Sequence, residues 1–239
     1  MKAMLLAAGF GTRLKPFTDH RPKALAEING KTLLQRNIAY LQQFGIYEVI
    51  VNVHHFAEHI IHSIQKNNGW RSKVEISDET DAILETGGGL KRASWFFEEE
   101  KNFVLMNVDI LTDLALDKMI AFHESNNPLA TLATTNRETS RYFLFNEEGI
   151  LCGWKNIKTG EKKIIREEGN LIPKAFSGIH IISTEIFPLM KQSETKFSMV
   201  DVYLSLCAED KILSFDHSNT KFIDVGKPES LLQASQIFK

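Results

Sequence analysis

The chain has 239 residues, 43% of them hydrophobic and 24% charged, and its formal net charge is −2. This composition is typical of a globular protein with one large domain, and it excludes collagen, a coiled coil or disorder as a description of the whole chain. The near-neutral charge excludes a strongly basic nucleic-acid surface, so an anionic ligand needs a local cluster of cations. The two cysteines, Cys152 and Cys207, predict neither a disulfide framework nor a cysteine zinc site.

The apolar run at the N-terminus stops at Gly9, and basic residues follow it. A secretory signal needs an apolar core of about 7–15 residues and then a cleavage site. No apolar stretch approaches the roughly 20 residues that span a bilayer. We therefore expect a cytoplasmic protein in a reducing compartment, with no membrane or nucleic-acid partner. Homo-oligomer formation is left open.

The first 135 residues alternate short apolar runs with segments of helical periodicity. Strands are predicted over residues 2–8, 48–53, 74–76, 103–107 and 129–135. Helices are predicted over residues 32–44, 56–65, 90–99 and 114–123. Thr32 is expected to cap the first helix and Gly45 to end it, while a triple glycine precedes the third. This alternation predicts parallel βαβ units with right-handed crossovers.

The pattern changes after residue 135. Antiparallel ribbon is predicted over residues 141–152 and 162–166, with turns at Glu148-Gly149 and Thr159-Gly160. Strands at 176–182 and 222–225 and helices at 199–208 and 230–238 follow, with Asp201 as an early-turn carboxylate. We expect one α/β domain over residues 1–239 with a small antiparallel cap. Ligands of open α/β sheets bind at the carboxyl ends of strands, so the loops there are candidate sites.

The first strand ends in a glycine loop, Gly9-Phe-Gly-Thr-Arg13. Two glycines let backbone amides approach a phosphate, Thr12 adds a hydroxyl donor, and Arg13 and Lys23 add positive charge. The loop lacks the third glycine of a Rossmann fingerprint and does not match a P-loop. From these residues alone, a polyanion cradle and a glycine turn with solvated basic residues both remain open.

The stretch from Gly9 to Leu25 resembles the signature loop of sugar-1-phosphate nucleotidyltransferases, G-x-G-T-R-x-x-P-x-T-x-x-x-P-K-x-L, and meets every fixed position. The resemblance implies a three-layer α/β/α Rossmann-like fold with a mixed, mostly parallel sheet, the nucleotide-diphospho-sugar transferase fold. Residues 1–135 would bind the nucleotide and residues 136–239 the sugar phosphate. The implied nucleotide-binding residues are Ala8, Gly9, Gly11, Thr12, Arg13, Lys23, Glu79, Thr86, Gly87 and Gly88.

Two aspartates extend the resemblance. Asp109 follows a buried strand in an Asn-Val-Asp segment, and Asp224 lies in Phe-Ile-Asp-Val-Gly, which is similar to the family segment W-x-D-V/I-G. In the family these carboxylates bind Mg²⁺, a hard cation that takes few carboxylates and keeps sites for water and phosphate oxygens. The resemblance therefore implies Asp109 and Asp224 as metal ligands. Together with Arg13 and Lys23, which would neutralise charge as pyrophosphate leaves, they form the implied catalytic set.

Two further segments resemble the family. Residues 84–89, Leu-Glu-Thr-Gly-Gly-Gly, are similar to the segment that covers the nucleobase and starts a helix. Residues 176–180 are similar to the strand that borders the sugar, where Gly178 would leave room for a hexose. The family's E-K-P segment, whose lysine touches the sugar phosphate, is missing, and Lys155 stands near its place. The implied sugar-phosphate residues are Asn107, Lys155, Ser177 and Gly178.

The implied reaction transfers a nucleoside monophosphate from an NTP, UTP or GTP, to a sugar 1-phosphate and releases pyrophosphate. Within the family, the compact length and the segment at Glu85 most resemble N-acetylmuramate-1-phosphate uridylyltransferases, with short mannose- or heptose-1-phosphate guanylyltransferases as the alternative. Two interpretations from other classes remain. One is a non-catalytic nucleotide-binding regulator. The other is a zinc peptidase, because His55-Phe-Ala-Glu-His59 matches H-x-x-E-H with both histidines expected on one helical face.

Overall fold

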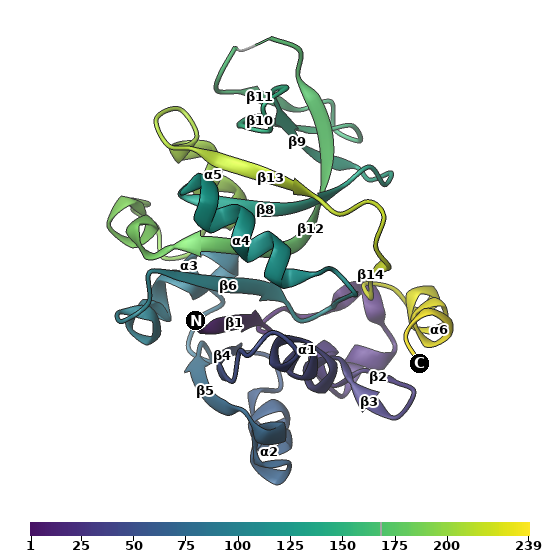
Figure 1. Ribbon diagram of the computed structural model, residues 1–239. Helices are drawn as coiled ribbons and strands as arrows, with labels where there is room; N and C mark the ends of the chain where they lie inside the picture. The colour runs from purple at the N-terminus through teal and green to yellow at the C-terminus, as the bar shows by residue number, and fades with distance from the viewer. Residues whose placement is uncertain (168) are drawn as a thin grey trace.

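The computed structural model describes residues 1–167 and 169–239, and a ten-stranded sheet forms its centre (Figure 1). Its strands are β1 (Ala3–Leu6), β4 (Glu48–Val53), β5 (Lys73–Asp78), β6 (Asn102–Asn107), β8 (Ala130–Thr135), β9 (Arg141–Phe145), β10 (Leu151–Asn156), β11 (Lys162–Ile164), β12 (Ile172–Ser183) and β13 (Ile212–Asp216). The order is β11-β10-β9-β12-β6-β1-β4-β5, and β8 pairs with both β12 and β13.

The pairing confirms the predicted mixed sheet with an antiparallel cap. Strand β1 runs parallel to β4 and β6, β4 runs parallel to β5, and β8 runs parallel to β13. Strand β12 runs antiparallel to β6 and β8 and continues upward to pair with β9 of the cap. The division into a nucleotide half and a sugar half stays a prediction.

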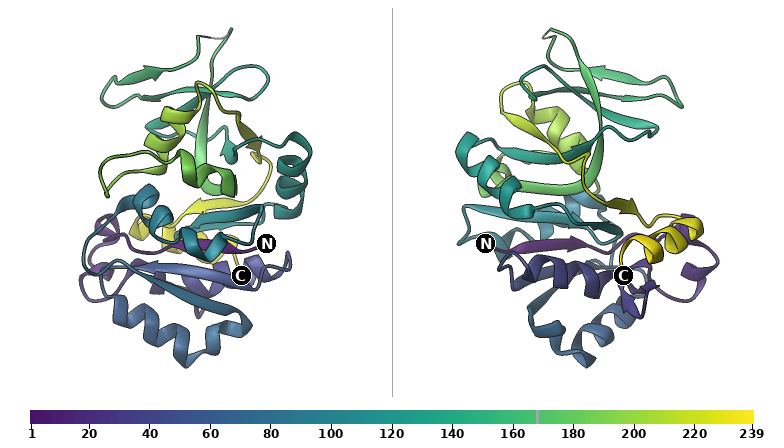
Figure 2. Two further views of the ribbon diagram at one scale, coloured as in Figure 1. Left: turned by 90° about the vertical axis from the view of Figure 1, so that its left-hand side faces the viewer. Right: turned by 45° about the vertical axis from the view of Figure 1, so that its right-hand side comes forward.

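Helices cover both faces of the sheet, which confirms the three-layer arrangement (Figures 1 and 2). Helices α1 (Leu33–Gln42), α2 (Ala57–Lys66) and α4 (Leu116–Asn126) pack in one buried core against one face of β1 and β4. Helices α3 (Glu85–Arg92) and α5 (Met199–Leu206) share the second core. Alternation within β1 explains this, because Ala3 and Leu5 belong to the first core and Met4 to the second.

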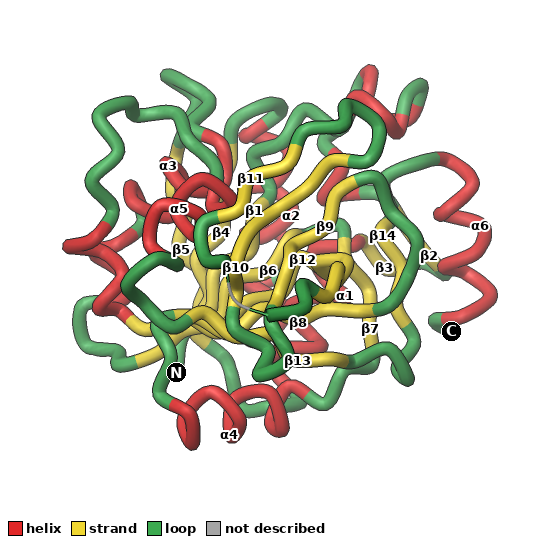
Figure 3. The backbone as a smooth tube through the Cα atoms, turned by 90° about the horizontal axis from the view of Figure 1, so that it is seen from above, coloured by secondary structure: helices red, strands yellow, loops and turns green. Residues whose placement is uncertain are grey.

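A third apolar cluster lies at one edge of the molecule, where helix α6 (Pro228–Ile237) stands apart from α3 and α5 (Figure 3). Around it lie two short antiparallel pairs. One joins β2 (Glu27–Ile28) to β3 (Lys31–Thr32), and the other joins β7 (Ile110–Thr112) to β14 (Phe222–Asp224). Leu14, Leu111 and Ile223 are buried together there. This cluster therefore packs the glycine loop against two segments that lie far away in the sequence.

The predicted helix ends agree with the structure at two caps. The Thr32 hydroxyl accepts a hydrogen bond from Gln35 N at 3.1 Å, and Ser198 and Asp201 form a capping box at the start of α5. None of the helices among the described residues is long and apolar enough to cross a bilayer.

The helix predicted over residues 90–99 was wrong in its position. Helix α3 occupies Glu85–Arg92 and contains the three glycines, and residues 94–97 form a short 3-10 turn. Packing overrides the low helix propensity of glycine here. A Cβ at Gly88 would lie 2.2 Å from the carbonyl oxygen of Thr195, so only glycine lets the helix dock against that segment.

Candidate active site

A cavity of about 420 Å³ opens where the carboxyl ends of β1, β4 and β6 meet. Residues from both ends of the chain line it: Leu6, Ala7, Ala8, Gly9, Gly11, Thr12, Arg13, Lys23, Asn52, Glu79, Ile83, Glu85, Thr86, Asn107, Val108, Asp109, Ser198 and Gly226. This is the end of an α/β sheet where ligands are expected. Eight of the ten residues predicted to bind the nucleotide line the cavity, all except Gly87 and Gly88.

The glycine loop forms one wall of the cavity. Gly11 has φ +63°, and a Cβ there would lie 2.9 Å from Thr18 Cγ2, so the close turn requires glycine. The Thr18 hydroxyl donates to the Gly11 carbonyl at 2.9 Å, and Leu14 N donates to the same oxygen at 2.8 Å. A Cβ at Gly9 would meet nothing within 4 Å, so the loop leaves open space there. The loop is therefore held rigid while its surface stays accessible to a phosphate.

Lys23 and Asp109 form an ion pair on the cavity wall. Lys23 begins a short 3-10 turn, and Asp109 lies between the end of β6 and the start of β7. Their side chains are 11% and 18% exposed, so the pair is shielded from bulk water but still reachable from the cavity. The structure thus joins a predicted catalytic cation to a predicted metal ligand.

The β7–β14 pair brings Asp224 to the same place. Asp224 lies opposite Ile110, and Val225 N donates to the carbonyl oxygen of Asp109 at 2.9 Å. Burial raises the pKa of Asp224, and the neighbouring charge of Asp109 raises it further. Arg13 is close as well, because a Cβ at Gly226 would lie 2.7 Å from Asp224 Oδ1 and 3.0 Å from Arg13 Nη2. All four predicted catalytic residues therefore converge.

The carboxylate pair has the character of a divalent-cation site. Asp224 Oδ1 is buried and has no hydrogen-bond partner among the described residues. A cation between two repelling carboxylates would satisfy this oxygen and offset the repulsion. Over residues 1–167 and 169–239 no cluster of three or more His, Cys, Asp or Glu side chains could enclose a metal. Two carboxylates with room for phosphate oxygens are a donor set that fits Mg²⁺.

Two buried polar residues, Asn52 and Glu79, form another part of the cavity wall. Asn52, near the end of β4, accepts a hydrogen bond from Ala7 N at 2.6 Å and donates one to Glu79 Oε1 at 2.7 Å. Glu79 is fully buried, and this burial raises its pKa although Asn52 acts against the shift. A Cβ at Gly89 would lie 2.6 Å from Glu79 Oε1. These contacts fix the glycine loop relative to α3.

Gly87 and Gly88 face a protein segment. Their amides donate to the Phe197 carbonyl oxygen at 2.9 and 3.1 Å, and a Cβ at Gly87 would lie 2.5 Å from the Phe197 ring. Thr86 lines the cavity while its hydroxyl accepts a hydrogen bond from Met199 N at 2.9 Å. Contact of the two glycines with a nucleobase stays a prediction, and their observed role is to dock the segment that precedes α5.

Of the residues predicted for the sugar phosphate, Asn107 lines the cavity and Gly178 adjoins it. Gly178 has φ +74°, and a Cβ there would lie 2.8 Å from Asn107 Nδ2. The buried Ser177 hydroxyl is 2.8 Å from Nε2 of His217. Lys155 belongs to β10 of the cap, and its ammonium lies over the Tyr142 ring, 5.6 Å from the centroid. Asn107, Ser177 and Gly178 therefore lie together, whereas Lys155 belongs to the cap. Of the four, Asn107 alone is among the described residues that line the cavity.

The histidine motif does not form the expected helical face. Helix α2 begins at Ala57, so His55 precedes the helix, and Phe56 between them is left-handed with φ 55°. His59 stacks on the Phe56 ring with centroids 5.3 Å apart. The expectation of two zinc ligands on one helical face is therefore wrong, because the left-handed residue turns the chain before the helix starts.

Arg137 is near the site and was missed by the sequence analysis. It follows the end of β8 closely. Burial and the charge of Asp109 raise the pKa of Asp224, whereas the charges of Lys23, Arg13 and Arg137 lower it. The available signal was an arginine just beyond the end of a predicted strand, which is where ligand-binding residues of α/β sheets occur.

The chain is similar to known proteins along nearly its whole length. A family model described as nucleotidyl transferase matches residues 2–239. The chain is 29% identical over 238 residues to the N-acetylmuramate alpha-1-phosphate uridylyltransferase of Caulobacter vibrioides, covering 97% of this chain and 94% of that protein. It is 27% identical over 244 residues to the mannose-1-phosphate guanyltransferase of Yarrowia lipolytica, covering all of this chain but spanning 64% of that protein.

A solved structure is similar over the whole chain. The crystal structure of HddC from Yersinia pseudotuberculosis complexed with GMP-PN has a TM-score of 0.78 and 26% sequence identity, covering 100% of this chain and 99% of that one. The chain therefore shares its fold with a solved structure along its whole length.

Proposed function

Because the chain belongs to the nucleotidyl transferase family, we propose that it transfers a nucleoside monophosphate from an NTP to a sugar 1-phosphate and releases pyrophosphate. The resemblance inferred from the sequence is thereby confirmed at the level of the family. The observation that carries the proposal is the convergence of Arg13, Lys23, Asp109 and Asp224 beside the glycine loop.

The chemistry follows from the charges of the two substrates. A phosphate oxygen of the sugar 1-phosphate attacks the α-phosphorus of the NTP in line, and the bond from that phosphorus to the bridging oxygen of the β-phosphate breaks. Pyrophosphate leaves with the electron pair. The nucleophile is already an anion, so the reaction needs neither a general base nor a covalent intermediate. The protein has to hold two polyanions together and offset their repulsion.

The residues of the cavity suit this task. The glycine loop and Thr12 line the cavity, and the open space beside Gly9 leaves room for phosphate groups to approach the loop. Arg13 and Lys23 hold positive charge against the phosphates that leave as pyrophosphate. Asp109 and Asp224 would hold Mg²⁺, which neutralises charge on phosphate oxygens when it is bound.

The first candidate for the substrate pair is UTP with N-acetylmuramate 1-phosphate. Its support is the similarity to the uridylyltransferase of Caulobacter vibrioides, which extends over nearly the full length of both proteins. The alternative is GTP with a mannose or heptose 1-phosphate. The guanine nucleotide is supported by the likeness to HddC in complex with GMP-PN, which covers almost all of both chains, and mannose 1-phosphate by the similarity to the mannose-1-phosphate guanyltransferase of Yarrowia lipolytica.

A substrate panel tests the proposal. Pyrophosphate release is measured with Mg²⁺, each of the four common NTPs, and the 1-phosphates of N-acetylmuramate, mannose, a heptose and glucose. We expect turnover with one dominant pair and its loss in Asp109→Asn, whose fold should be intact by circular dichroism. Release with no pair, from a folded protein, would overturn the proposed reaction. Unchanged turnover in Asp109→Asn would overturn the metal assignment.

A further inference from the structure

Arg137 lies between two strands that border the carboxylate pair. Its guanidinium is 5.2 Å from the centroid of the Phe222 ring, in the strand that carries Asp224. Its Nη2 donates to the carbonyl oxygen of Phe176 at 2.9 Å, in the strand that carries Gly178. The side chain therefore sits at the boundary between the proposed metal site and the predicted sugar side.

The guanidinium retains hydrogen-bonding capacity. Its Nε is buried without a hydrogen-bond partner among the described residues. Over the same residues, none of the ion pairs in the structure involves Arg137. Leaving a buried donor unpaired is costly, so a structural role alone does not explain this arrangement. A ligand that accepts hydrogen bonds and carries negative charge would complete it.

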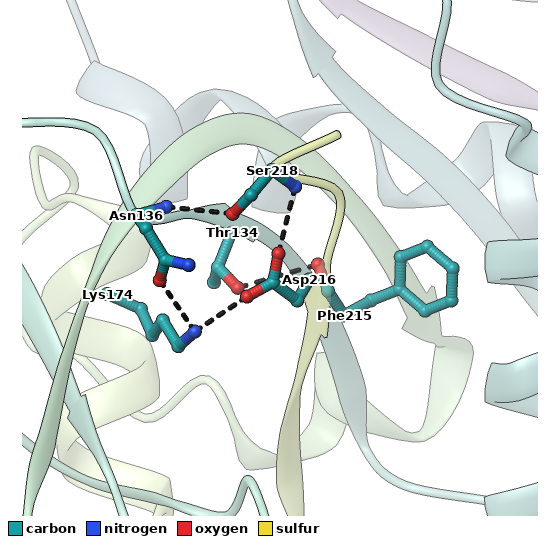
Figure 4. Close-up of polar contacts among 6 residues, drawn as sticks. All are labelled: Thr134, Asn136, Lys174, Phe215, Asp216 and Ser218. Atoms are coloured by element: carbon teal, nitrogen blue, oxygen red, sulfur yellow. Dashed lines mark hydrogen bonds and ion pairs between the residues drawn. The ribbon is translucent and has the colours of Figure 1, made fainter. Parts of the chain in front are cut away.

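A hydrogen-bonded network holds Asn136, the residue before Arg137 (Figure 4). Asn136 N donates to Ser218 Oγ at 3.0 Å, and Lys174 Nζ donates to Asn136 Oδ1 at 2.7 Å. Lys174 also pairs with Asp216 at 2.6 Å, and Asp216 accepts a hydrogen bond from Ser218 N at 2.8 Å. This closed network joins β12 and β13 to the loop after β8. It preorganises the position of the arginine, as binding residues require.

Under the proposed function, two polyanions must meet at this cavity. Arg13 ends the glycine loop, where the NTP is proposed to bind, and Lys23, which also lines the cavity, is engaged with Asp109. Arg137 is outside the set of described residues that line the cavity, and it contacts the strand of Ser177 and Gly178. Lys155, the one cation among the four residues predicted for the sugar phosphate, lies with its ammonium over the Tyr142 ring in the cap.

We propose that Arg137 binds the phosphate of the sugar 1-phosphate, a role that rests on the proposed function. A guanidinium presents several N–H donors in one plane and pairs with a phosphomonoester through two oxygens. The contact to Phe176 and the Phe222 ring orient the group. Its charge holds the attacking phosphate close to the carboxylate pair without contributing to binding of the NTP.

The test compares Arg137→Gln and Arg137→Lys with Arg141→Gln, an exposed arginine at the start of β9 that serves as the matched control. Pyrophosphate release is measured with the preferred pair, varying each substrate while the other is saturating. We expect Arg137→Gln to raise the KM for the sugar 1-phosphate about 10- to 100-fold and to leave the KM for the NTP unchanged. Arg137→Lys should recover part of the loss, and Arg141→Gln should match the wild type.

Three outcomes overturn the proposal. An unchanged KM for the sugar 1-phosphate in Arg137→Gln excludes the contact. An equal rise in both KM values, with a lowered melting temperature, assigns Arg137 to structural support. If the wild type releases no pyrophosphate, the proposed function fails, and calorimetric titration with mannose 1-phosphate then decides the role of Arg137. The proposal is supported if mannose 1-phosphate binds to the wild type and to Arg141→Gln but not to Arg137→Gln. It is overturned if all three proteins bind mannose 1-phosphate equally, or if the wild type does not bind it.

Discussion

Replacing Asp224 by asparagine should separate function from stability. The carboxylate is next to Asp109, its Oδ1 is buried without a partner among the described residues, and burial followed by the Asp109 charge raises its pKa. A carboxyl whose pKa is raised on folding is destabilising when ionised. Asp224→Asn removes that charge and keeps the shape, so we expect the free protein to gain about 1 kcal/mol of stability at pH 7. Because protonation neutralises the wild-type carboxyl, this gain should shrink as the pH falls toward 4.

The same variant should lose its response to Mg²⁺ and its turnover. A ligand present at ten times its Kd stabilises the protein that binds it by about 1.4 kcal/mol. Urea denaturation with and without Mg²⁺ should show this gain in the wild type and not in Asp224→Asn. Turnover should fall by at least about 100-fold, since even residues behind a metal ligand affect activity by 10- to 100-fold.

Asp216→Asn is the matched control for stability. Burial alone would raise the pKa of Asp216, but hydrogen bonds from Lys174 and Ser218 outweigh it and lower the pKa to about 2. Asparagine should therefore destabilise the protein at position 216 and leave the response to Mg²⁺ intact. The reasoning is refuted if Asp224→Asn is destabilised like this control, or if it still responds to Mg²⁺ as the wild type does.

Three further predictions concern the loop, the buried wall and the core. Gly9→Ala should keep the stability of the wild type, because its Cβ meets nothing within 4 Å. The same variant should raise the KM for the NTP in steady-state assays. An unchanged KM would place the triphosphate elsewhere. Glu79→Ala should lower the free energy of unfolding in urea by about 1–3 kcal/mol, because it leaves the buried Asn52 amide unpaired. Glu79→Gln should recover most of this loss. Equal stability of the two variants would contradict the role of the Asn52–Glu79 pair. Three buried histidines should stay neutral on NMR titration down to about pH 5, because burial lowers their pKa values from 6.5. The free energy of unfolding should therefore be complete above pH 6.5 and should fall by about 1–2 kcal/mol for each histidine by pH 5. Titration of these histidines near pH 6.5 would contradict this. They are His123, with a pKa of about 4, His180, with about 3, and His217, with about 4.

The central-sheet strands within residues 1–135, which are β1, β4, β5, β6 and β8, could be predicted from the sequence, because each is a short apolar run bounded by a helix signal. The glycine loop could be predicted for another reason, since it requires particular residues at fixed spacing. The carboxyl-end rule then placed Asp109 at the ligand end of its strand.

The remaining parts of the site depend on tertiary contacts that leave little local pattern. Strand β7 is three residues long, and it pairs with β14 to bring Asp224 beside Asp109. Helix α3 begins early because its glycines pack against the segment before α5, which low helix propensity alone would not predict. Arg137 belongs to none of the sequence motifs identified above. Its position depends on the hydrogen bonds and the ion pair that Lys174 makes with Asn136 and Asp216.

Diffraction from crystals grown with a non-hydrolysable NTP and Mn²⁺ in place of Mg²⁺ tests the proposed site most directly. The anomalous signal of manganese identifies the ion independently of the protein atoms. The structure predicts one peak between the carboxylates of Asp109 and Asp224, with the triphosphate along the loop from Gly9 to Arg13. A nucleotide bound with its ion at other residues, or with both carboxylates free of it, would contradict the proposed site.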